Sequence, residues 1–153
     1  MLLKKSNILS NKFVALIEDN IQEIADMFMN DLLKSPETVA YRQLDRQEVY
    51  EAAYKRLHEI SKWIMKDYPK QEIERYYRQI GRERFEQGIP FTAAFRFLVL
   101  LKRHTWIFVL KKLYYDATVY EQALELNNRV VLYFDRAAYY LLCGYDDMLK
   151  KKW

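Results

Sequence analysis

The first residue that could do chemistry is His104. It lies in a long segment, from Pro90 to Tyr115, that is apolar almost all round, and its neighbours at helical spacing include Leu101 and Phe108. That spacing places the imidazole against or inside the core. A histidine in such a place usually serves as a hydrogen-bonded core residue, but it could also ligate a haem or act as a buried proton switch. The residues alone leave these alternatives open.

Three arginines form the second candidate group. Arg96 and Arg103 share one edge of the same apolar segment, and Arg84 lies on the inward line of the segment before it. A buried guanidinium must be paired, or it costs several kcal/mol. One interpretation is a structural ion pair between Arg84 and Asp135. The other is an anion pocket in which Arg84, Arg96 and Arg103 hold a carboxylate or phosphate of a small ligand.

Motifs for other chemistry fail on their spacing. The three glycines are isolated, so none belongs to a phosphate-binding loop. His58-Glu59 begins like a zinc-protease motif, but Lys62 stands where the second histidine is required. We therefore expect no catalytic residue, no metal site and no cofactor, haem included.

The elements that position these residues are predicted to be helices. The 153 residues are 51% hydrophobic and 30% charged, which is a globular balance, and they include only 3 Gly and 3 Pro. A protein of many strands needs far more turn residues, so the composition predicts an all-α fold. Apolar residues at helical spacing predict five helices, at about 13–34, 45–68, 70–87, 90–115 and 118–142.

Proline and glycine set the predicted helix ends. Ser35-Pro36 stops the first helix, and a polar loop follows. Gly88 closes the third helix as its C′ residue, and Gly144 ends the fifth. We therefore expect a single domain over residues 1–153, with a core over about 11–142 and a basic tail over 143–153.

The last two predicted helices favour association. Each is long enough to span about 35–40 Å, and a helix that is apolar almost all round must be covered. We expect a second copy to cover part of this surface, giving a homodimer. The 13 tyrosines are typical of residues that straddle the core and surface or lie in a protein interface.

Charge and cysteine content indicate the setting. The net charge of +4 is spread thinly over the chain and does not form a stripe, so a nucleic-acid partner is not expected. Three consecutive polar residues, Lys102, Arg103 and His104, interrupt the most apolar segment, so we expect no membrane span. The single cysteine, Cys143, and an N-terminus unlike a signal peptide indicate the cytoplasm.

The stretch GRERFEQGIPF at 81–91, followed by an aliphatic helix that reaches LKRHTW at 101–106, resembles the N-terminal sensor domain of the RsbR-type (RsbRD) stressosome co-antagonist family. The resemblance covers roughly residues 11–142, and Arg84, Gly88 and Arg103 match the family motif. It implies a non-enzymatic, typically dimeric sensor module that passes its input to an output domain. It gives these three residues no catalytic role, and it implies a fold that can be globin-like without haem.

No output domain of the STAS or kinase type follows in the 153 residues, so we expect either an excised sensory domain or a protein that acts by association. The expected function is signal transduction in bacterial stress or two-component type regulation, through contact with a signalling partner or a fused output domain. The alternative is a helical protein that binds a small anion or haem. It would use Arg84, Arg96 and Arg103, or His104.

Overall fold

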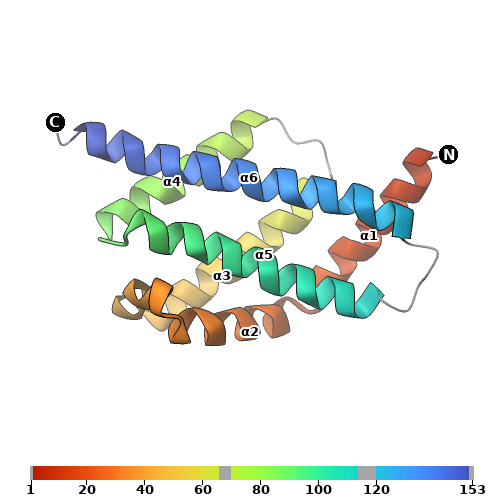
Figure 1. Cartoon of the computed structure of the whole chain (residues 1–153), viewed down its shortest axis with the longest axis horizontal. Helices are drawn as coiled ribbons and strands as arrows, with labels where there is room; N and C mark the ends of the chain where they lie inside the picture. The colour runs from red at the N-terminus through yellow and green to blue at the C-terminus, as the bar shows by residue number, and fades with distance from the viewer. Residues whose placement is uncertain (1, 66–69, 114–119, 152–153) are drawn as a thin grey trace.

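The computed structural model describes residues 2–65, 70–113 and 120–151, and every regular element within them is a helix. The elements are α1 (Leu2–Asp19), α2 (Ile21–Lys34), the 3₁₀ helix η1 (Pro36–Gln43), α3 (Arg46–Met65), α4 (Lys70–Glu86), α5 (Phe91–Leu113) and α6 (Tyr120–Lys151). The all-α prediction is confirmed, but these residues form seven helices where the periodicity predicts five. Figure 1 shows α5 and α6 running side by side, with α4 crossing behind α6.

The first predicted helix, residues 13–34, is two helices. Its apolar stripe is buried as predicted, from Phe13 to Leu32. The break is at Asn20, whose φ of −127° and ψ of 22° are not helical, and whose Nδ2 donates to the carbonyl oxygen of Leu16 at 2.9 Å. An asparagine side chain that bonds nearby backbone competes with the hydrogen bonds of a helix. Asn20 therefore separates α1 from α2 while both keep their apolar sides in the core.

The loop predicted after Ser35-Pro36 is in fact the helix η1. Thr38 is buried there, and its Oγ1 donates to the carbonyl oxygen of Leu32 at 2.6 Å. Tyr41 is buried as well, with its ring centroid 5.2 Å from that of Phe97. A short helix held by one threonine and one tyrosine has no apolar period of its own, so the sequence pattern predicts a loop.

Gly88 closes α4 as predicted. Its φ of 76° lies in the left-handed region, which glycine adopts without a penalty from a Cβ atom. The N–H of Gly88 donates to the carbonyl oxygen of Phe85, and the N–H of Ile89 donates to that of Arg84, each at 3.0 Å. These bonds satisfy carbonyls of the last helical turn. Because α4 ends at Glu86, Arg84 lies in its last turn. Helix α5 begins directly after Pro90.

The prediction that Gly144 ends the last helix is wrong, because α6 continues through it to Lys151. Gly144 lies against Gly81 of α4 instead. A Cβ atom on Gly144 would overlap the carbonyl oxygen of Arg78, and one on Gly81 would overlap that of Leu141. The two backbones touch because neither position has a side chain. This glycine therefore serves helix packing and not helix termination.

One cluster of buried side chains takes residues from every helix of the described part. The predicted helix ends at Tyr68-Pro69 and Tyr115, and the predicted start at Thr118, lie outside the described residues. No helix in the part of the chain that the structure describes is both long and apolar enough to cross a membrane.

Candidate functional site

His104 joins α5 to α2. Its Nε2 lies 2.8 Å from Oδ2 of Asp31, and its ring meets the ring of Phe28 edge-on, with centroids 6.5 Å apart. The side chain is 15% exposed, so it lies at the edge of the core, where the helical spacing predicts it. One of its two ring nitrogens is therefore engaged by a carboxylate of the protein itself.

The three arginines singled out from the sequence do not meet. Nε of Arg96 lies 2.6 Å from Oε2 of Glu37, which links α5 to η1. Arg103 is exposed on α5. Arg84 lies on the last turn of α4, where its Nη1 donates to Oε1 of Gln87 at 2.7 Å. The anion pocket expected from Arg84, Arg96 and Arg103 together is therefore not formed in the structure.

Arg84 does not pair with Asp135 either. Helix α6 turns Tyr133, Phe134 and Ala137 inward, which leaves Asp135 exposed on its outer side. The guanidinium of Arg84 lies over the ring of Tyr41 instead, with Cζ 5.9 Å from the ring centroid. Among the described residues no carboxylate forms an ion pair with Arg84.

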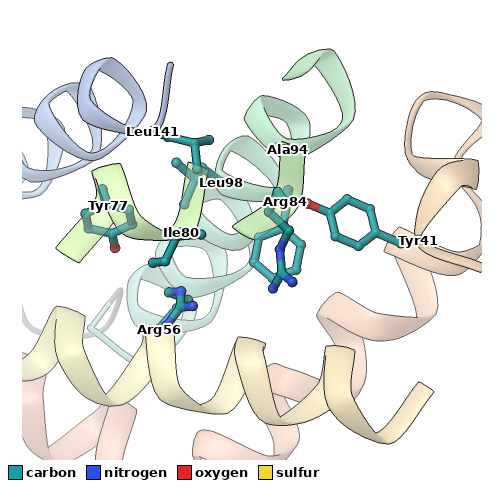
Figure 2. Close-up of a pocket in the computed structure, with 9 residues that line it drawn as sticks. Tyr41, Arg56, Tyr77, Ile80, Arg84, Ala94, Leu98 and Leu141 are labelled. Atoms are coloured by element: carbon teal, nitrogen blue, oxygen red, sulfur yellow. The ribbon is translucent and has the colours of Figure 1, made fainter. Parts of the chain in front are cut away.

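A different arginine, Arg56 of α3, lies on the same cavity as Arg84 (Figure 2). It is only 8% exposed. Its Nη1 donates to the hydroxyl of Tyr76, and its Cζ lies 4.9 Å from the centre of that ring. Tyr41 and Tyr77 line the cavity beside the two arginines. We call the following residues the arginine–tyrosine cluster: Tyr41, Arg56, Tyr76, Tyr77, Arg84 and Tyr133.

Helical spacing explains how α3 and α4 bring the two arginines together. Tyr77 and Arg84 are seven residues apart on α4, so they share one face of that helix. Arg56 follows buried Ala53 by three residues and precedes buried Ile60 by four, which places it on the inward stripe of α3. An arginine within an apolar stripe is the sequence signal that could have identified Arg56.

The buried tyrosines of the cluster are neutral near pH 7. The hydroxyls of Tyr77 and Tyr133 share a hydrogen bond deep in the fold. Burial raises the pKa of both above its usual range, although the charge of Arg56 opposes this shift. Burial also raises the pKa of Tyr41 to about 12, against the opposing charges of Arg84 and Arg56. The phenols therefore offer dipoles to the two guanidiniums but no negative charge.

The contacts of Arg56 do little more than offset the cost of its burial. Taking a charged group out of water costs several kcal/mol even after the protein relaxes. A cation–π contact contributes about 0.5 to 2 kcal/mol, and a hydrogen bond that involves a charged group contributes about 1.5 to 3 kcal/mol. No carboxylate of the described residues forms an ion pair with Arg56. The cluster is thus a partly buried site in which two guanidiniums lie beside neutral phenols, Arg56 buried and Arg84 half-buried.

This arrangement suits binding or positioning better than bond-breaking chemistry. Guanidiniums hold anions but do not exchange protons near neutral pH, and the phenols beside them are protonated. Within the described residues, no three His, Cys, Asp or Glu side chains gather as a metal site requires.

Comparison with known proteins assigns the family. No curated protein and no solved structure matches the chain. A family model described as the RsbT co-antagonist protein rsbRD N-terminal domain matches residues 22–148. The match runs from α2 nearly to the end of α6 and contains the whole arginine–tyrosine cluster. It also contains the stretch at 81–91 that carries the resemblance seen in the sequence. The chain therefore belongs to the family of RsbT co-antagonist rsbRD N-terminal domains, which are signalling domains of the stressosome type.

Proposed function

We propose that this chain is a non-enzymatic signalling domain that works as a homodimer and relays its signal by contact with a signalling protein or an output domain. The family assignment supports a role in stress signalling. The arginine–tyrosine cluster supports the absence of catalysis, because its described side chains pair donors with neutral phenols and include no general base.

The exposed face of α6 carries the proposal of a dimer. Leu132 and Tyr139 are seven residues apart on this helix and are 49% and 65% exposed, so they form an apolar stripe on one side. Asp135 and Arg136 lie between them with opposite charges. The helix has 32 residues, which corresponds to a length of about 48 Å. A face of this length and composition suits a second helix.

The order of these four residues is self-complementary. In a two-fold dimer each residue meets its counterpart across the axis, so the same patch must fit itself. If two copies of α6 cross antiparallel at the midpoint between Asp135 and Arg136, Asp135 faces the partner subunit's Arg136. The same axis places Leu132 opposite the partner subunit's Tyr139. A single two-fold axis therefore produces both the apolar contact and the ion pair.

Sedimentation velocity of the purified chain tests this proposal. We expect the native chain to sediment as a dimer and the variant Leu132→Glu/Tyr139→Glu as a monomer, because burying the new carboxylates in the interface is costly. Val39→Glu is the matched control, since Val39 of η1 is also 49% exposed but lies on a different element. It should remain dimeric. A monomeric native chain, or a double variant that dimerises as tightly as the native chain, would show that this face is not the interface.

A further inference from the structure

The cavity beside the arginine–tyrosine cluster is small and lined by two positive charges. Figure 2 shows the side chains of Arg56 and Arg84 entering the same space from α3 and α4. The room open to the centre of a water molecule is about 10 Å³, which holds about one water or an ion of similar size. The remaining walls are mostly apolar, formed by Ile80, Ala94, Phe97, Leu98 and Leu141 beside the rings of Tyr41 and Tyr77.

The two guanidiniums have more N–H donors than the described residues accept from. Each arginine carries five N–H donors. Arg56 donates to the hydroxyl of Tyr76, and Arg84 donates to Oε1 of Gln87. Neither forms an ion pair with a carboxylate of the described residues, and the phenols around them stay protonated. The carboxylates of Glu59 and Glu83 act electrostatically on Tyr76, but neither forms an ion pair with Arg56 or Arg84. Two like charges therefore lie beside one cavity without a directly bonded counter-charge among the described residues.

We propose that this cavity binds one small inorganic monoanion of the size of chloride, held between the guanidiniums of Arg56 and Arg84. An anion there would accept hydrogen bonds from both arginines and would remove the repulsion between them. The cavity volume selects a monatomic or similarly compact anion, because a phosphate ester or an organic carboxylate needs more room than one water. The site is distinct from the face of α6 proposed above as a dimer interface, so either proposal can fail without the other.

Bromide, a heavier halide that can be located directly, provides the first test. Crystals of the native chain soaked in sodium bromide should show an anomalous-scattering peak in the cavity between Arg56 and Arg84. A cavity that contains only water, or nothing, at high bromide concentration would overturn the proposal.

Chloride binding in solution provides the second test, measured as the excess linewidth of the ³⁵Cl resonance. We expect Arg84→Gln to weaken chloride binding at least about tenfold, because the anion loses a charged donor. Arg56→Gln should do the same, and Arg84→Gln decides the question if the Arg56 variant does not fold. Arg103→Gln is the matched control, since Arg103 is an exposed arginine of α5, and it should bind chloride as the native chain does. Equal excess linewidth for Arg84→Gln and the native chain would overturn the proposal.

Discussion

At the scale of single residues, Arg56 shows how this fold keeps a positive charge inside. Its planar guanidinium lies against the ring face of Tyr76 and donates a hydrogen bond to the hydroxyl of that tyrosine. A guanidinium is more weakly hydrated than an ammonium group, so it tolerates such a place better than lysine would. The buried charge of Arg56 is stabilised by the neutral hydroxyl and the ring face of Tyr76. Each hydroxyl of the cluster therefore matters more to stability than a surface hydroxyl does.

The hydrogen bond between Tyr77 and Tyr133 gives a direct prediction. Tyr133→Phe should lower the free energy of unfolding by about 1 to 3 kcal/mol, because the hydroxyl of Tyr77 then remains buried without its partner. Tyr77→Phe should cost a similar amount. The double variant should cost clearly less than the two single variants added together, since it leaves neither hydroxyl behind.

Urea unfolding of the four chains in this cycle measures the coupling. The control is Tyr54→Phe, which removes a hydroxyl from a side chain of α3 that is 44% exposed and should change stability by no more than about 0.5 kcal/mol. Losses that simply add in the double variant would mean that the two hydroxyls do not depend on each other.

The sequence predicts some of these residues and misses others for a physical reason. Periodicity shows which side of a helix faces inward. The structure has His104 at the edge of the core, while Arg84 is only half-buried. Periodicity does not show what lies opposite, so the partner expected for Arg84 was Asp135, while the structure provides Tyr41 and Gln87. Arg56 lies on an inward stripe that the sequence reveals, but its site exists only because Tyr76, Tyr77 and Arg84 of α4 lie opposite it.

At the scale of elements, apolar stripes are predicted well and interruptions are not. The stripe from Phe13 to Leu32 is buried on both sides of the break at Asn20. A single asparagine is compatible with either a continuous or a broken helix, and the packing of the neighbouring helices decides between them. The same holds for η1, where the buried Thr38 and Tyr41 meet partners on α2 and α5. These partners lie outside η1, so the sequence of η1 alone does not reveal them.

The contact of α4 with α6 yields a prediction in which two effects have opposite signs. Alanine favours a helix over glycine by about 1 kcal/mol, so propensity alone predicts that Gly144→Ala stabilises the chain. The Cβ atom would overlap the carbonyl oxygen of Arg78, however, and a backbone atom cannot move aside alone. The helices must separate, and overpacking of this kind costs about 1 to 3 kcal/mol or more. We therefore expect a net loss of stability.

Urea unfolding of Gly144→Ala and Gly81→Ala, compared with Asn30→Ala, measures this balance. Asn30 is exposed on α2, so its replacement reports helix propensity without a new contact, and it should be neutral or slightly stabilising. If Gly144→Ala were as stable as the native chain, α4 and α6 would not approach as closely as the two glycines indicate.

At the scale of the whole molecule, α6 contacts more of the other helices than any local pattern predicts. It packs mainly on α4 and also contacts α1, α3 and α5. It contributes Tyr133 to the arginine–tyrosine cluster and carries the exposed face proposed for dimerisation. The cluster, the glycine contact and the proposed interface therefore all draw residues from one helix.

The last turns of α6 test this view, because the sequence pattern ends the core at about residue 142. Tyr145 is 5% exposed, and its hydroxyl donates to the carbonyl oxygen of Ile89 at 2.8 Å. Nearby, Asp147 lies 2.8 Å from Nη2 of Arg82. A chain that ends at Leu142 loses these contacts and the packing of Gly144. Loss of a buried aromatic side chain costs about 3 to 5 kcal/mol, so we expect the Tm to fall by about 10 °C or more.

A chain that ends at Met148 is the matched control for this truncation. It removes residues 149–153, of which the described ones, Leu149, Lys150 and Lys151, are exposed, and it keeps Tyr145 and Asp147. Its Tm should therefore stay within a few degrees of the native value, because exposed residues contribute little to stability. The comparison separates the loss of helix length from the loss of buried contacts, since both chains shorten α6. If the two truncated chains melted at the same temperature as the native chain, the turns after Leu142 would be a tail and not part of the core.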